Sequence, residues 1–90
     1  MLKDIVDVKH LGGHRLLLRF EDETVGQVDI SSLVKFTGVF APLAALSEFA
    51  KVRVNPELGT IVWPNGADLD PDVLYSVVTG QPIAVAYQPA

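Results

Sequence analysis

Cysteine is absent from this chain of 90 residues, and cationic side chains are few, with 7 Lys plus Arg against 11 Asp plus Glu. Without cysteine the chain can form no disulfide, no thiolate nucleophile and no cysteine-based zinc site. The formal net charge of −4 repels phosphate backbones and argues against direct nucleic-acid binding. The classes that remain are enzymes without a thiol, small-ligand or metal binders and protein-interaction modules.

Long hydrophobic runs and a leader pattern are missing as well. The first residues, MLKDIVDVKH, reach an acid at Asp4, and no run approaches the ~18 apolar residues that cross a bilayer. These absences predict a cytoplasmic chain with no membrane segment. With 49% hydrophobic and 20% charged residues, the sequence is that of one globular domain over residues 1–90. Because so short a chain has a small core, association into a homodimer would help to stabilise it.

The first third alternates as strands do and predicts a three-stranded antiparallel meander. Its first turn contains Gly12 and Gly13. A two-residue turn would mix charged and apolar side chains on one face, so the pattern favours a three-residue loop, residues 11–13, with His10 opposite His14. That loop gathers the apolar side chains on one face: Val6, Val8, Leu16, Leu18 and Phe20.

Two residues of the following segment do not suit an ordinary hairpin. Glu23 occupies a turn where glycine would be comfortable, which predicts a loose loop or local strain. Gly26 lies inside the third strand, which predicts a bulge or the close approach of another segment.

The rest of the chain predicts two short helices and a second hairpin. A helical turn capped by Asp29, Ser31 or Ser32 comes first, and an amphipathic helix should follow over 41–50. Two short strands flank a turn at 56–59, with their register left open. The fold class is therefore α+β, a small antiparallel sheet formed by the N-terminal three-stranded meander and the second hairpin, with two short helices packed on it.

The second helix starts at Pro71 and stops at Gly80. Its apolar residues fall on one stripe: Val73, Leu74, Val77 and Val78. After it, Ile83, Val85 and Tyr87 alternate as in a strand, which should add to this sheet or to that of a partner.

Three acids, Asp68, Asp70 and Asp72, occupy every second position before the second helix. A calcium loop that begins at Asp68 would need Gly where Val73 stands and Glu where Thr79 stands. Asp70 instead suits a helix cap before Pro71, and Asp72 suits the first turn. Asp68 could close the preceding bend onto its backbone. Structural acids are favoured, and a metal or acid/base site remains the alternative.

The other polar groups supply no complete site. His10 and His14 could share a metal, but two ligands make no selective site, so a pH-sensitive or partly exposed pair is favoured. Four serines lie outside any nucleophile-elbow motif: Ser31, Ser32, Ser47 and Ser76. Lys9, Arg15 and Arg19 form at most a small basic patch. The sequence therefore predicts no catalytic, cofactor-binding or metal-ligating residue.

Contact with a protein is better supported than catalysis. Trp63 beside a turn could anchor an interface, although core packing is the favoured reading for a single tryptophan. The turn after it and the C-terminal alternation supply the other candidates. The candidate interaction residues are Trp63, Asn65, Asp68, Asp70, Ile83, Val85 and Tyr87.

Four stretches carry a resemblance to a known bacterial family: RLLLRFED, GVFAPL, VRV and TIVWPNGADLDPDVLY. The chain resembles the family called domain of unknown function 2442, with one departure at Glu23, where relatives often have glycine. The resemblance implies a small α+β protein without an established enzyme activity. Some members look like the N-terminal part of helix-turn-helix proteins. Others are encoded beside a small partner, in an arrangement similar to toxin and antitoxin pairs.

These observations leave three hypotheses open. The favoured one is a non-catalytic interaction or regulatory module, antitoxin-like and homodimeric, that binds a small protein encoded nearby. The second is a small-ligand or metal-dependent activity at Asp68, Asp70 and Asp72. The third is a nucleic-acid-linked regulator, which would require salt-dependent binding to DNA.

Overall fold

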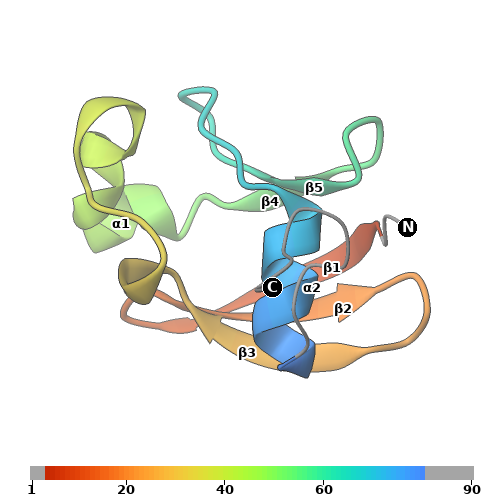
Figure 1. The fold of residues 1–90 in the computed structure, drawn as a ribbon. Coiled ribbons are helices and arrows are strands. Elements are labelled where there is room, and N and C mark those ends of the chain that lie inside the picture. Colours follow the sequence, from red (N-terminus) through yellow and green to blue (C-terminus); the bar gives the residue numbers. More distant parts are fainter. Residues whose placement is uncertain (1–3, 81–90) are drawn as a thin grey trace, which may run out of the picture.

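The computed structural model describes residues 4–80, and Figure 1 shows how their elements are arranged. Two antiparallel sheets, three short helices and one longer helix make up this part of the chain. In chain order the elements are β1 (Ile5–Gly12), β2 (Arg15–Phe20), β3 (Val25–Asp29), η1 (Ile30–Ser32), η2 (Gly38–Ala44), α1 (Leu46–Phe49), β4 (Arg53–Asn55), β5 (Thr60–Val62) and α2 (Pro71–Thr79).

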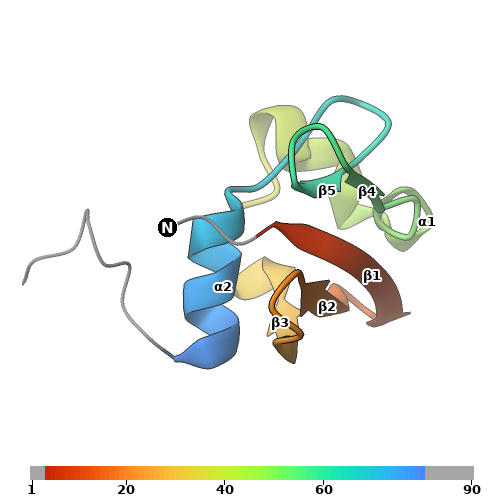
Figure 2. The same ribbon diagram turned by 90° about the vertical axis from the view of Figure 1, so that its right-hand side faces the viewer.

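The sheets have the predicted membership, β1-β2-β3 and β4-β5. The two are joined through β1, where the Ile5 amide donates to the Gly59 carbonyl at 2.8 Å. Figure 2 shows the β4–β5 hairpin lying over β1, with α2 standing beside the three-stranded sheet. The α+β class expected from the sequence is confirmed.

The register of the first hairpin differs from the prediction. Gly12 pairs with Arg15 and His10 with Leu16, so the turn has two residues and His10 does not face His14. A register shift between His10 and Gly12 adds one residue to β1. This bulge restores the parity that a two-residue turn would otherwise break, so the apolar side chains still share a face.

A second irregularity in β1 places Ile5 in the core in place of Val6. The register shifts between Ile5 and Asp7, so Ile5 lies opposite Phe20. Ile5 is 1% exposed and Val6 is 42% exposed. The prediction that Val6 belongs to the apolar face is therefore wrong, because the bulge turns it outward.

The core lies between the three-stranded sheet, the second hairpin and α2. Side chains alternate between the two faces of a strand. The covered face of the sheet therefore carries Leu16, Leu18 and Phe20 from β2 and Val28 from β3. The remaining large side chains of the core come from every later part of the chain: Ile30, Leu43, Phe49, Ile61, Trp63 and Leu74.

The predicted helix over 41–50 is split in two. Residues 38–44 form the 3-10 helix η2, Ala45 is extended with ψ of 124°, and α1 covers only Leu46–Phe49. Leu43 and Phe49 are both buried. On a continuous helix these two side chains would point about 120° apart, so the break at Ala45 lets both enter one core.

The glycine of β3 marks a close approach, as its position indicated. A Cβ on Gly26 would overlap the side chain of Val78, which lies on α2. Gly26 therefore lets the helix lie directly against the strand. This contact sets how near the helix comes to β3, the edge strand of the three-stranded sheet.

Candidate interaction site

The turn that precedes α2 is closed by its own backbone. The Gly66 amide donates to the Trp63 carbonyl and the Trp63 amide to the Ala67 carbonyl, each at 2.9 Å. The Asn65 carboxamide oxygen also accepts from the Ala67 amide at 3.2 Å. These bonds fix the path by which the chain leaves β5 and enters the helix.

Asp70 and Asp72 take the helix-terminal positions expected of them. An Asp70 carboxylate oxygen accepts from the Asp72 amide at 2.8 Å, and Pro71 occupies the first turn. The helix ends at Gly80, whose φ of 74° is left-handed. Asp72 lies in the first turn, where the helix dipole favours a negative charge. The reading of these two acids as helix-start residues is confirmed.

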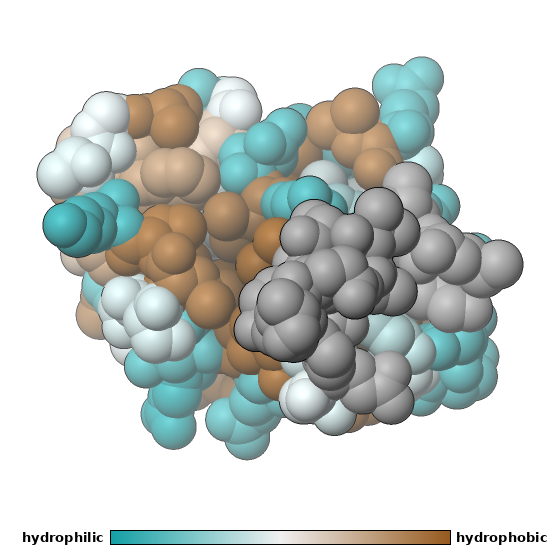
Figure 3. All heavy atoms as spheres, viewed as in Figure 1, coloured by the Kyte–Doolittle hydropathy of each residue, from teal (hydrophilic) through white to brown (hydrophobic). Residues whose placement is uncertain are grey.

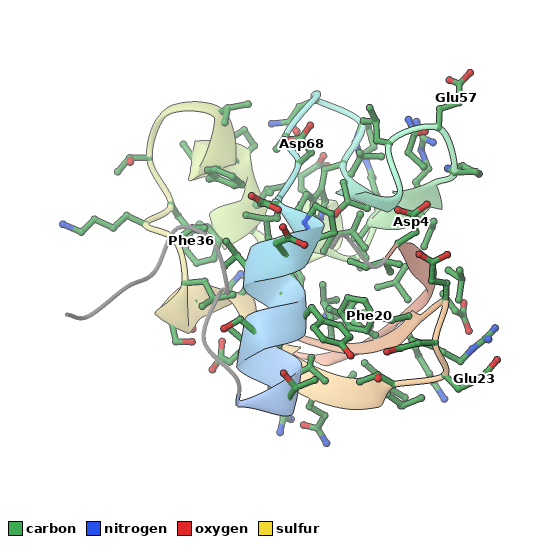
Figure 4. The ribbon with its side chains drawn as sticks, turned by 45° about the vertical axis from the view of Figure 1, so that its right-hand side comes forward. Asp4, Phe20, Glu23, Phe36, Glu57 and Asp68 are labelled. Carbon is green, nitrogen blue, oxygen red and sulfur yellow. The ribbon has the colours of Figure 1, made fainter. Side chains whose placement is uncertain are left out.

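Asp68 has a different environment from the other two acids. It is exposed, and its backbone forms an isolated antiparallel bridge with Val62. In the view of Figure 4 it lies on the turn that leads into α2. Within residues 4–80, no three His, Asp or Glu side chains are placed to hold a metal ion together. The described residues around Asp68 therefore hold no such group of metal ligands.

Trp63 and Asn65 are engaged inside the molecule. Trp63 is 1% exposed, and its indole nitrogen donates to the Phe49 carbonyl at 2.9 Å. The Asn65 amide nitrogen donates to the Val39 carbonyl at 2.7 Å. Trp63 thus has the core position that the sequence favoured, and Asn65 ties the turn to η2. Three further candidates lie outside the described residues: Ile83, Val85 and Tyr87.

His10 and His14 do not pair across the hairpin, and both of their rings contact the ring of Phe49. His10 and His14 contact Phe49 with centroid distances of 5.5 and 4.7 Å. Each imidazole donates from Nε2 to a carbonyl, His10 to Gly13 at 2.8 Å and His14 to Leu43 at 2.9 Å. The pair therefore holds the β1–β2 turn and η2 in place.

The outer face of the three-stranded sheet carries charges of both signs. The register sets Asp7 opposite Arg19 and Arg15 opposite Asp29. The Ser31 hydroxyl and the Ser31 amide each donate to the Asp29 carboxylate, and these hydrogen bonds lower the pKa of Asp29. The charges of His14 and Arg15 lower it by a smaller amount. Arg15 and Arg19 thus each lie opposite an acid on this sheet.

An apolar surface beside α2 is the feature that the sequence did not resolve. The four apolar residues of the predicted stripe on α2 differ in exposure. Leu74 is buried and Val78 is partly buried, whereas Val73 and Val77 are 37% and 41% exposed. Val39 on η2 is 50% exposed. We call Val73 and Val77, which lie four residues apart on α2, the α2 apolar face. The sequence offered one indication of this exposure, which is the width of the apolar stripe. A short helix that packs on one side cannot bury so wide a sector.

Figure 3 shows hydrophobic surface on the part of the molecule to the left of α2 in Figure 1, where the segment with η1 and η2 lies. Several partly buried side chains from this segment and from the chain just before α2 pack on the core: Leu33, Val34, Phe36, Phe40 and Leu69. Phe36 lies to one side of α2 and Phe20 to the other in Figure 4. The segment that contains η1 and η2 therefore carries apolar side chains of its own, on the Phe36 side of α2.

The fold is that of a small α+β protein whose described surface combines an apolar face with acids at one helix start. Residues 5–80 match the family described as "Protein of unknown function (DUF2442)". The chain belongs to this family, as its sequence motifs indicated. No curated protein and no solved structure matches the chain significantly. No helix among residues 4–80 has the length and hydrophobicity required to cross a membrane.

Proposed function

We propose that this chain is a non-catalytic protein-interaction module that works in the cytoplasm as one domain. Its supporting observation is the α2 apolar face, where Val73 and Val77 are 37% and 41% exposed. Contiguous apolar surface costs free energy in water, at roughly 25 cal/mol per Å², and covering it with a partner recovers that energy. A partner protein is therefore the ligand class that this surface suits.

The specific form of the proposal is regulation by pairing with a small protein encoded nearby, as an antitoxin pairs with its toxin. A homodimer is the proposed state of the chain. A small core stabilises a monomer only marginally, and both kinds of association would add buried apolar area. Neither form requires a reactive side chain.

The test is isolation of the full chain, affinity-tagged at its N-terminus, from its own host after brief chemical cross-linking. The proposal expects one small protein to co-purify in a fixed ratio, and light scattering to give the mass of a dimer or of a defined complex. The tag alone serves as the control. A monomer with no enriched partner, under every growth condition tried, would refute the proposal.

A further inference from the structure

We infer that the α2 apolar face receives a short amphipathic segment of a partner protein, with basic side chains beside its apolar ones. This inference rests on the proposed function and adds the chemistry of the partner. It combines three features of the structure: an apolar ridge, unneutralised carboxylates at its end, and a rigid frame.

The apolar ridge comes from helical spacing. Val73 and Val77 are four residues apart, so they lie one above the other on the same side of α2. The helix of 9 residues is about 13 Å long, which matches two to three turns of an apposed helix. Phe36 and Phe40, partly buried, belong to the segment that contains η1 and η2, and Phe36 lies to one side of α2 in Figure 4. The ridge therefore offers apolar contacts at helical spacing to a helical segment of a partner.

The charge next to the ridge is negative. Asp70 precedes Val73 by three residues and Val77 by seven, so it lies on the same side of α2. Asp68 and Asp72 flank it in the chain, and neither of the two ion pairs found among residues 4–80 involves any of these acids. Lys35 is the exposed cation of the neighbouring segment. A partner with cations near the start of α2 would therefore meet carboxylates that neither of these ion pairs neutralises.

The frame around the face is held by side-chain hydrogen bonds. The Asn65–Val39 bond of 2.7 Å joins the turn before α2 to η2, and the His14–Leu43 bond of 2.9 Å joins η2 to the sheet. A preformed surface loses little conformational entropy on binding. The turn before α2, η2 and the sheet are therefore held together before a partner docks.

The experiment uses the full chain and two synthetic peptides of about 14 residues, long enough to form an amphipathic helix on a surface. Both carry leucines at helical spacing, one with lysines and the other with glutamates at the remaining positions. Fluorescence anisotropy of the labelled peptides measures binding at low and high salt. Val73→Ser/Val77→Ser tests the face. Val25→Ser is the matched control, because Val25 is 53% exposed and its side chain points to the face of β3 opposite to that of Gly26, which contacts α2.

The inference expects the lysine peptide to bind and the glutamate peptide to bind at least about tenfold more weakly. Val73→Ser/Val77→Ser should weaken the lysine peptide by about tenfold or more, whereas Val25→Ser should leave it unchanged. Asp68→Asn should weaken it about two- to threefold at low salt and have no effect at high salt.

Three results would overturn the inference. The first is equal binding of both peptides, or binding that Val73→Ser/Val77→Ser leaves unchanged. The second is a homodimer that the double substitution converts to monomer, since a second copy would then cover the face. The third is absence of peptide binding together with changes in the nuclear magnetic resonances of residues 81–90 in the double variant. A host partner retained equally by the double variant would refute this face and leave the proposed function standing.

Discussion

The hydroxyl of Tyr75 donates to an Asp22 carboxylate oxygen at 2.7 Å, which joins α2 to the β2–β3 turn across 53 residues of sequence. The Tyr75 ring also meets Phe20 edge to face, with centroids 5.0 Å apart. One side chain thus packs on the core through its ring and holds the turn through its hydroxyl. The bond lies on the side of α2 opposite to its exposed valines.

Tyr75→Phe should reduce the free energy of unfolding by about 0.5–1.5 kcal/mol, because it removes the hydrogen bond and keeps the ring. Tyr75→Ala should cost more, since the contact with Phe20 is lost as well. Urea unfolding followed by the fluorescence of Trp63, the only tryptophan, measures both values. A Tyr75→Phe variant as stable as the wild type would show that the bond contributes nothing.

Gly26→Ala should destabilise the fold by about 1–3 kcal/mol, because the new methyl group meets the side chain of Val78. Val78→Ala removes that obstacle. The double variant Gly26→Ala/Val78→Ala should therefore be more stable than the sum of the single effects predicts, by about 1 kcal/mol. Thermal unfolding of the wild type, the two single variants and the double variant measures this coupling. If the two single effects on stability simply add in the double variant, the contact between Gly26 and Val78 is contradicted.

Glu23→Gly should stabilise the protein by about 0.5–1 kcal/mol. Glu23 has a φ of 71°, a left-handed conformation that costs a residue with a Cβ more than it costs glycine. The pair with Arg19, at 3.7 Å and largely exposed, offsets little of this gain. Glu23→Gln is the control, since it removes the charge and keeps the strain. A melting temperature raised by Gln and not by Gly would refute the explanation.

Asp70→Ala should lower the free energy of unfolding by about 1 kcal/mol, and Asp70→Asn by much less, because asparagine also caps helices. Asp68→Ala should have little effect, since Asp68 is exposed and outside the helix. Melting temperatures measured with and without calcium, magnesium or manganese complete the test. A cation-dependent increase abolished by Asp68→Ala would instead establish a metal site at this turn.

Asp29 should make the fold sensitive to acid. Its pKa is lower in the folded protein than its ordinary value of 3.8, chiefly through the Ser31 hydroxyl. The resulting stabilisation is complete above that ordinary value and is lost as the pH falls through the folded pKa. Ser31→Ala should raise the pKa of Asp29 toward 3.8 and reduce the acid-dependent loss. Carboxyl-carbon resonance titration measures the pKa, and an unchanged value would exclude Ser31 as its cause.

Local sequence determined the elements whose signals lie within a few residues. Asp70, Pro71 and Gly80 fix the two ends of α2 through backbone groups that neighbouring residues satisfy. Strand alternation likewise placed Leu16, Leu18 and Val28 on the covered face. The capping chemistry of the acids was predictable for the same reason, since it involves adjacent amides.

Tertiary structure decided which of several compatible faces is buried. Ile5 replaces Val6 because a bulge in β1 fits the pairing with β2, and the helix over 41–50 breaks at Ala45 because Leu43 and Phe49 both enter the core. Each choice depends on neighbours distant in sequence. The exposure of Val73 and Val77 is the functional consequence: the helical period defined an apolar stripe, and packing against Gly26 and Phe20 selected the part of α2 that stays uncovered.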